Sequence, residues 1–289
     1  MIKMKDFQNE MLDFLDDKLT NNFEICSENS ISSVNKIYSP FALSLIGIIL
    51  SSLNETSIDI LLQKIYKKLL STLNKAGIYN FYGNDEYFYD VDTTAGVNTF
   101  IFNYRQELPD KNNILEKISG NQNDQDGFIL TWFNRSRNNV DWFVNFNVFI
   151  FLRILGYHNE RLFMYLKNNV EAFLINGSRY YADVSLPLFM IFFYQDRNII
   201  NEQDFMIPKY MKVNKLSSKE NILSLALRYL NKDNMEYKTE KNVLLELLYD
   251  NWAKDIRYFN SSAAFYTSTE LNAAIALYLL NKMEVLKDE

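Results

Sequence analysis

Two kinds of helical segment alternate along the chain of 289 residues, and this alternation constrains the fold more than any other feature. The first kind is apolar on nearly every side and occurs at residues 41–53, 93–104, 141–155, 182–194 and 268–280. A helix that is apolar on every face must be surrounded by protein. The second kind is amphipathic, because its apolar residues recur at the spacing of three and four that marks one helix face, as at residues 57–73.

The spacing of the buried segments indicates a repeat. The first four begin roughly 40–50 residues apart, and the gap before the last has room for one more unit. Pairs of one buried and one half-exposed helix can stack into an open solenoid or close into a double-layered ring. Helices of an open array usually keep one exposed face, so the fully apolar segments favour the ring. We predict an all-α fold, an α/α toroid of paired inner and outer helices, with an open helical array as the alternative.

We expect residues 1–289 to form a single toroid domain. Residues 1–37 are predicted to form an N-terminal helix and loop, and residues 38–282 are predicted to hold the helical pairs. The chain has only 8 glycines and 4 prolines, and a β-rich fold of many tight turns needs more of both.

Charge and cysteine content exclude several kinds of partner and site. The net charge of −6 argues against nucleic acid, whose binding depends on clustered Lys and Arg. The longest apolar stretch, residues 41–50, is shorter than the roughly 20 residues that span a bilayer. The first twenty residues carry charges throughout, so we expect no secretory signal. Because Cys26 is the only cysteine, no internal disulfide can form, and we expect a cytoplasmic protein.

The most informative motif is Tyr-Asp-Val-Asp-Thr-Thr-Ala at residues 89–95, directly before a buried helix. Two interpretations are open. In the first, Asp92 or Thr93 caps the helix, because their side chains accept hydrogen bonds from its first N–H groups. In the second, Asp92 is a carboxylic acid kept protonated by burial and by the neighbouring charge of Asp90. The helix dipole favours the charged form and therefore opposes the second effect.

This motif resembles the Asp-x-Asp-Asp-Thr-Ala signature of class II terpene cyclases, the squalene–hopene and diterpene cyclase group. The matching residues are Asp90, Asp92, Thr94 and Ala95. Thr93 replaces the last aspartate, as in the Asp-x-Asp-Thr-Thr variant of drimenyl diphosphate synthases. The resemblance implies that Asp92 is the general acid that protonates an alkene or epoxide. Asp90 would tune that acid, and Thr93 bears on its strength and anchoring.

Further segments resemble bacterial squalene-cyclase-like repeat proteins. They are residues 139–148, 178–180 and 265–280, so the likeness runs from about residue 38 to 280. It implies the α/α toroid and makes cyclisation of a linear isoprenoid or its diphosphate the leading activity. Class II cyclases usually build their cavity between two such domains, whereas this chain holds one. We therefore expect a homodimer or a partner domain to complete the cavity, or else a different or lost activity.

Aromatic and amide side chains on the buried helices are candidates for the cavity wall. Rings can stabilise a developing carbocation through their faces, although core packing is the alternative for each of them. The candidates are Trp132, Trp142, Phe143 and Phe146. Asn145 and Asn147 either form a polar rim on the cavity or tie helix ends to neighbouring loops, because an unpaired buried amide costs roughly 1–3 kcal/mol.

Arginines are candidates for a diphosphate, because the guanidinium fork matches its oxygens. Arg153 lies on an apolar helix and Arg179 precedes a tyrosine pair, which makes them better candidates than Arg135 and Arg137. Mg²⁺ is expected only together with a diphosphate substrate, and otherwise no cofactor is required. No metal site is predicted, because one histidine and one cysteine far apart do not make a zinc site.

Two other functions stay open at this stage. One is a non-catalytic toroid that binds an isoprenoid, another apolar small molecule or a protein partner. The other is a glycosidase or lyase that uses paired carboxylates, which must face each other across a cleft. Asp90 and Asp92 are close in sequence, so such an enzyme would need a distant partner such as Asp141 or Glu270.

Overall fold

The computed structural model describes residues 3–21, 23–29, 34–53, 55–73, 77–83, 88–134, 139–181, 184–205, 207, 221–230, 241–254, 256–260 and 264–285. Its helices are α1 (Met4–Asn21), α2 (Pro40–Leu50), α3 (Thr56–Leu70), α4 (Val91–Arg105), α5 (Lys111–Gly120), α6 (Trp142–Ile154), α7 (Glu160–Asn176), α8 (Ser185–Asp196), α10 (Ile222–Leu230), α12 (Lys241–Asn251) and α13 (Thr269–Val285). Its strands are β1 (Ile25–Asn29), β2 (Val34–Ile37), β3 (Arg257–Asn260) and β4 (Ala264–Thr267).

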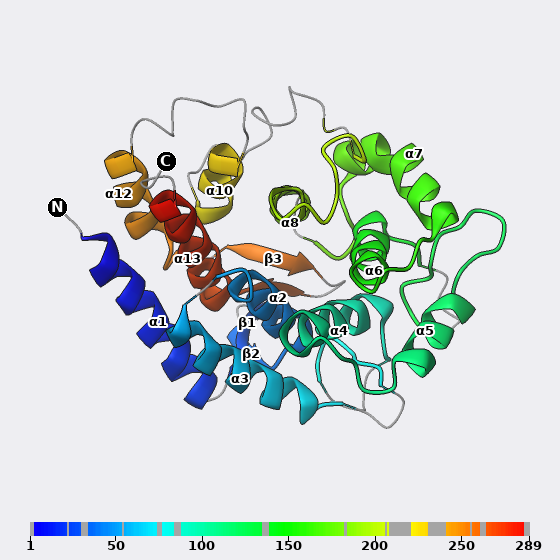
Figure 1. The fold of residues 1–289 in the computed structure, drawn as a ribbon, viewed down its shortest axis with the longest axis horizontal. Coiled ribbons are helices and arrows are strands. Elements are labelled where there is room, and N and C mark those ends of the chain that lie inside the picture. The colour runs from blue at the N-terminus through cyan, green and yellow to red at the C-terminus, as the bar shows by residue number, and fades with distance from the viewer. Residues whose placement is uncertain are drawn as a thin grey trace.

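In the described part of the chain, the inner layer of a ring is formed by α2, α4, α6, α8, α10 and α13 (Figure 1). In this layer α2 packs on α4, α4 on α6, α8 on α10, α10 on α13, and α13 back on α2. Helices α6 and α8 meet through side chains, with the rings of Phe146 and Tyr194 6.2 Å apart. Every residue of α2 is buried, as are the first ten of α8. Continuous apolar sequence in these segments therefore reflects enclosure on all sides.

Amphipathic helices cover this ring from outside. Helix α3 packs on α2, and α7 packs on α6, each through a single apolar face such as Ile58, Leu61, Leu62 and Ile65 of α3. The first and last helices also meet, because α1 packs on both α13 and α3. The predicted α/α toroid is confirmed, and the predicted room for one more unit before the last buried segment is occupied by α10.

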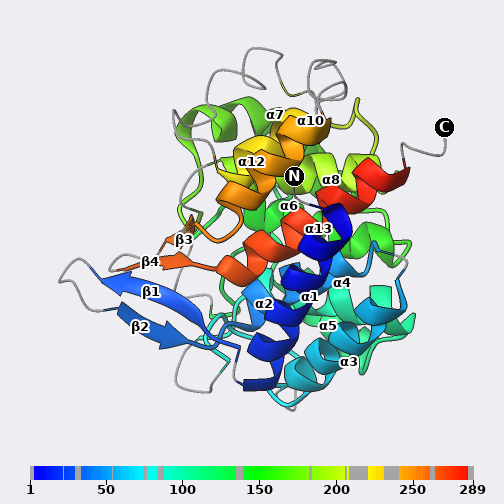
Figure 2. The ribbon, with the colours of Figure 1, turned by 90° about the vertical axis from the view of Figure 1, so that its left-hand side faces the viewer.

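A four-stranded antiparallel sheet, in the order β2-β1-β4-β3, was not predicted. One hairpin precedes α2 and the other precedes α13, and the two join through β1 and β4. Figure 2 shows the sheet at one end of the helical body, where α13 begins. Its strands are four or five residues long, too short for an alternating pattern to stand out from their polar composition.

None of the helices in the described part of the chain combines the length and the hydropathy needed to cross a lipid bilayer.

The contact between α2 and α4 depends on a missing side chain. A Cβ added at Gly47 would lie 2.5 Å from Cδ2 of Phe100, whose ring is fully buried and stacked on Tyr104. We expect Gly47→Ala to lower the free energy of unfolding by about 1–2 kcal/mol, because overpacking outweighs the better helix propensity of Ala. Urea unfolding measures this change.

Gly120 provides the matched control for that substitution. It is the last residue of α5, and a Cβ there would meet nothing within 4 Å. Gly120→Ala should leave stability unchanged or raise it by a few tenths of a kcal/mol. Equal effects of the two substitutions would contradict the described packing of α2 on α4.

Candidate active site

The first turn of α4 is held by Asp90, which is its N-cap. The Asp90 side chain has Oδ1 2.6 Å from the Thr93 amide, which donates to it. The prediction that Asp92 or Thr93 caps this helix is therefore wrong. Because Asp90 satisfies the amide, the Asp92 side chain is available for other contacts.

Asp92 joins three parts of the ring. Its Oδ1 accepts a hydrogen bond from Nδ2 of Asn147 on α6 at 2.7 Å. Its Oδ2 accepts one from the hydroxyl of Tyr181, in the segment that leads into α8, at 2.6 Å. The amide of Asn147 also lies 3.3 Å from the Tyr181 hydroxyl. Asp92 is 8% exposed, so this arrangement lies in the interior.

Burial favours the protonated form of this carboxyl. It raises the pKa of Asp92 to about 8, against the hydrogen bonds from Tyr181 and Asn147, which lower it. The nearby charges of Asp90 and Asp141 raise it further. Burial also raises the pKa of Asp90 to about 7, against the Thr93 amide, which lowers it. The raised pKa therefore favours the protonated form of Asp92 near neutral pH.

Aromatic rings pack on the ring of Tyr181, whose hydroxyl contacts this acid. Tyr181 packs edge-on against Phe143 of α6, Phe41 of α2 and Phe259 of β3, with centroid distances of 4.6, 6.2 and 5.9 Å. A β-bridge also pairs Tyr181 with Phe259. The sheet and the starts of the inner helices thus form one apolar end of the ring around Asp92.

Loops fix the start of α4 in this position. The amide of Asp90 donates to the carbonyl of Tyr79 at 3.1 Å, and that of Val91 donates to Thr131 at 2.9 Å. Thr94 adds a second tie, because its hydroxyl accepts from the Tyr79 amide at 3.0 Å. With its backbone held on both sides, Asp92 has little freedom to leave its two donors.

The other predicted aromatic residues lie in two environments. Trp132 pairs through its backbone with Asp90, and its indole N–H donates to the Tyr180 hydroxyl at 3.2 Å. Trp142 stacks on Phe146, and its indole N–H donates to the Leu166 carbonyl on α7 at 2.9 Å. Trp142 therefore joins the inner helix α6 to the outer helix α7, while Trp132 lies beside the start of α4.

The two asparagines of α6 differ in role. Asn145 exchanges hydrogen bonds with the backbone of Ile129, at 2.6 and 3.0 Å, and donates to the carbonyl of Asp141. Asn145 therefore ties the helix to a neighbouring loop, which is one of the two roles that the sequence left open for it. Asn147, two residues later, contacts Asp92 instead. Asp141 caps α6 and accepts from Ser178 and from the Arg179 amide, so its oxygens are occupied.

The predicted arginines have partners away from Asp92. Arg153 lies over the Phe149 ring and pairs with Asp204 at 3.4 Å. Arg179 is exposed and donates to Oδ1 of Asn139 at 3.2 Å. Arg135 and Arg137 lie outside the described residues.

Sequence reasoning missed Tyr181 as a partner of Asp92. Asn147 carried a signal, because an amide within an apolar helix needs a partner. The only feature of Tyr181 in the sequence is that it follows another tyrosine. That feature does not distinguish it from the other tyrosines among the 19 in the chain.

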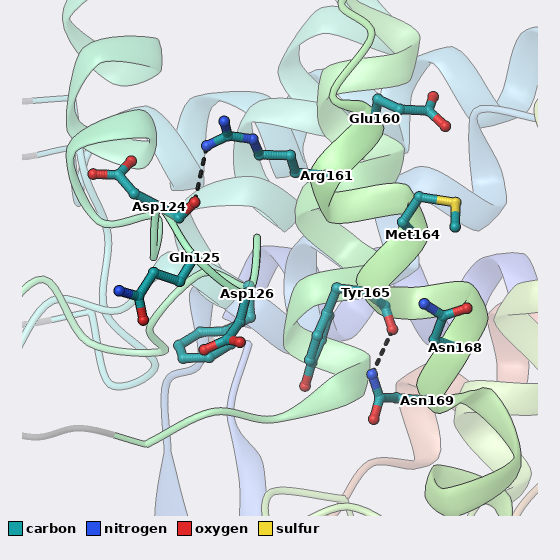
Figure 3. Close-up of a pocket in the computed structure, with 10 residues that line it drawn as sticks. Asp124, Gln125, Asp126, Glu160, Arg161, Met164, Tyr165, Asn168 and Asn169 are labelled. Carbon is teal, nitrogen blue, oxygen red and sulfur yellow. Dashed lines mark hydrogen bonds between the residues drawn. The ribbon is translucent and has the colours of Figure 1, made fainter.

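A polar pocket of about 560 Å³ lies on the outside of the ring, between α7 and the loop before α6 (Figure 3). Asp124, Asp126 and Glu160 line it, and Arg161 donates to the Asp124 carbonyl at 2.9 Å. Its carboxylates do not suit an apolar ligand, and Asp92 is not among its residues. No group of His, Cys, Asp and Glu suited to a metal ion occurs within the described ranges.

Comparison with known proteins gives the following matches. Residues 48–154 match the sequence profile of the sesquiterpene cyclase astC-like C-terminal domain. No curated protein matches the chain. The type II terpene cyclase MstE from Scytonema, in its apo form, has a TM-score of 0.67 at 10% identity, over 98% of this chain and 99% of that chain.

Two further structures have the same fold. MstE in complex with its substrate geranylgeranyl dihydroxybenzoate has a TM-score of 0.66 at 10% identity, over 98% of this chain and 99% of that chain. A protein from Actinoplanes has a TM-score of 0.66 at 10% identity, over 98% and 100%. The fold is that of the type II terpene cyclases. The predicted resemblance is confirmed, in sequence over residues 48–154 and in fold over nearly the whole chain.

The raised pKa of Asp92 makes a prediction about stability. Its folded-state pKa of about 8 lies above the unfolded value of 3.8. The folded protein therefore binds more protons than the unfolded chain between these values, and the contribution of Asp92 to stability is lost as pH rises through that window. The Asp92→Asn variant has no carboxyl at this position, so it does not lose this stability as pH rises. Urea unfolding should show the variant gaining stability relative to the natural protein from pH 5 to pH 8.

A stability difference that does not change with pH would contradict this protonation state, and one that changes in the opposite direction would mean that Asp92 is ionised in the folded protein.

Proposed function

We propose that this protein catalyses protonation-initiated cyclisation of a linear isoprenoid, with Asp92 as the general acid. The observation that carries the proposal is a buried carboxyl, with its pKa raised to about 8, which two donors hold at the aromatic end of the ring. The raised pKa keeps a proton on Asp92 until the substrate is in place, and the two donors stabilise the carboxylate that forms when this proton passes to the weakly basic alkene.

The proposed first step transfers one proton. The O–H bond of Asp92 breaks, and the π electrons of the substrate's terminal alkene form a new C–H bond, which leaves a carbocation on the more substituted carbon. The next alkene attacks this cation and closes a ring. Loss of a proton from the final cation balances the reaction, so the product is an isomer of the substrate.

The contacts of Asp92 favour this step. The transfer leaves a carboxylate, whose negative charge is stabilised by the Tyr181 O–H and the Asn147 amide more strongly than the neutral acid was. Burial has the opposite effect and keeps the proton in place beforehand. A proton donor to an alkene must hold its proton before the transfer and be stabilised as a carboxylate after it. These two effects on Asp92 meet both requirements.

Ring faces support the cationic part of the reaction. Phe143, Phe41 and Phe259 pack on the ring of Tyr181, whose hydroxyl contacts Asp92. Aromatic faces attract cations. Among the residues predicted for this role, Phe143 packs against Tyr181, and Trp132 pairs through its backbone with Asp90. Trp142 and Phe146 would act only through the rings that they pack against.

The comparison with MstE supports a linear isoprenoid substrate. It also supports a site built from a single ring of helices. That protein binds geranylgeranyl dihydroxybenzoate, and its chain is covered over 99% of its length by this one. A homodimer or partner domain stays a prediction. We also propose that the substrate can carry a diphosphate with Mg²⁺ as its counterion, and the assay below tests this. Protonation of the alkene itself needs no cofactor.

Product analysis by gas chromatography–mass spectrometry tests the reaction directly. Farnesyl, geranylgeranyl and squalene-type substrates should be supplied with and without Mg²⁺. We expect a cyclic product whose rate of formation falls by about 10²- to 10⁴-fold or more in Asp92→Asn. Asp16→Asn, at the paired surface aspartate of α1, is the control and should keep full activity. Equal rates for the Asp92→Asn and natural proteins would rule out Asp92 as the acid.

The pH profile tests the role of Tyr181. Activity needs protonated Asp92, so it should fall as pH rises through about 8. Tyr181→Phe removes a donor that stabilises the carboxylate, so the basic limb should move to higher pH while the maximal rate falls by about 10- to 100-fold. Tyr180→Phe is the neighbouring control, because its hydroxyl contacts Trp132 and Asn139. It should leave the limb in place, and a limb that moves down in Tyr181→Phe would contradict the proposal.

A further inference from the structure

A second polar cluster lies at the end of the ring opposite Asp92. It is formed by the last turns of α8 and α10 and by α13, which are neighbours in the ring (Figure 1). Oδ2 of Asp196 accepts hydrogen bonds from the Tyr278 hydroxyl and the Lys282 ammonium group, both at 2.6 Å. These contacts join the end of α8 to α13.

Two donors in this cluster have nothing to bind. Nη1 of Arg197 and the hydroxyl of Tyr229 are buried, and neither has a hydrogen-bond partner among the described residues. A buried donor without an acceptor is unfavourable, and native structures retain one only for a reason. The other buried atoms of this kind in the described ranges belong to Tyr38, Tyr79, Asp90 and Thr131, in segments that lead into α2, α4 and α6.

The two donors lie at the ends of neighbouring helices, because α8 and α10 pack on each other. Burial and the Asp196 carboxylate raise the pKa of the Tyr278 hydroxyl, while Arg197 lowers it and Tyr229 raises it. Both groups therefore act on the same hydroxyl. The guanidinium of Arg197 also lies 5.7 Å from the centre of the Phe193 ring, which itself packs on Tyr278 at 5.1 Å. Charges in the cluster sum to one positive, from Arg197, Lys282 and Asp196.

The helix dipole does not account for this arrangement. Cations are favoured at helix C-termini, which explains why Arg197 and Lys282 carry positive charge there. It does not explain a guanidinium nitrogen that is buried without an acceptor. Arg153 shows the contrast, because it occupies the same place at the end of α6, over Phe149, but pairs with Asp204.

The length of α8 relates this cluster to the acid. Tyr181, which contacts Asp92, lies four residues before the helix, and Asp196 is its last residue. The twelve residues of α8 rise roughly 18 Å. A ligand that reaches both ends of the ring must therefore be long, with acceptor atoms at one end and an alkene at the other.

We propose that Arg197 and Tyr229, with Lys282 beside them, bind the oxyanion head group of the linear isoprenoid whose far end reaches Asp92. The head group is a phosphate or a carboxylate, since both present oxygen acceptors to a guanidinium fork. This inference rests on the proposed cyclisation and names the residues that orient its substrate. It assigns the head group to α8 and α10 in place of Arg153 and Arg179.

Binding measured without turnover tests this site separately from catalysis. Asp92→Asn protein should be titrated by calorimetry with farnesyl diphosphate, farnesoic acid and farnesol, which share a chain and differ in head group. Arg197→Gln should weaken binding of at least one anionic probe by about 10- to 100-fold and leave farnesol unchanged. Tyr229→Phe should weaken the same probe by about 2- to 10-fold.

Arg105→Gln is the matched control. Arg105 ends the inner helix α4 and lies over Tyr66, but it is exposed. Its substitution should not change binding of any probe. Each of Arg197→Gln and Arg105→Gln removes a guanidinium that lies over an aromatic ring, so the thermal midpoints of the two ligand-free variants should change by similar small amounts.

Three results would overturn the head-group site. They are equal weakening of all three probes, no anion-specific loss in Arg197→Gln, and failure of both anionic probes to bind the parent protein. An anion-specific loss in Arg153→Gln alone would also overturn it, by moving the head group to α6. If the protein cyclises a neutral isoprenoid and also shows any of these results, the proposed function stands and the head-group site is wrong.

Discussion

The burial of an aspartate side chain in the first turn of a helix is the constraint on which the rest of the site depends. The helix dipole and free N–H groups at this position both favour the ionised form. In this structure one aspartate caps the helix, and the other is the buried carboxyl. Asp90 accepts from the Thr93 amide, while Asp92 turns away from the helix end toward Asn147 and Tyr181. Burial then raises the pKa of Asp92 without leaving its oxygens unpaired.

The ring is what brings these groups together. Asp92, Asn147 and Tyr181 belong to three successive helical units and are far apart in the sequence. They meet because the starts of α4, α6 and α8 lie at the same end of the ring, where the sheet adds Phe259. The opposite end carries the polar cluster of Asp196, Tyr278 and Lys282. The two ends therefore differ in chemistry, which is what an extended ligand with unlike ends requires.

The fold was predictable from the sequence because burial leaves a regular pattern. Helices enclosed on all sides are apolar all round, and helices with one solvent face are not. The small sheet left no such pattern, because its short strands are stabilised by pairing between hairpins that lie more than two hundred residues apart. The aspartate motif located the site, but not which aspartate caps the helix. That choice depends on the backbone of residues 77–83 and on Thr131, which fix how α4 begins. Tyr181 and Arg197 were not predicted, because their environment arises only when separate helical units pack together.

Infrared difference spectroscopy of the carboxyl groups tests the central claim most directly. The natural protein at pH 7, compared with Asp92→Asn, should show the carbonyl stretch of a protonated, hydrogen-bonded carboxyl, and this band should disappear as pH rises through about 8. A difference spectrum at pH 7 that contains only the bands of an ionised carboxylate would contradict the account, because Asp92 would then hold no proton to transfer.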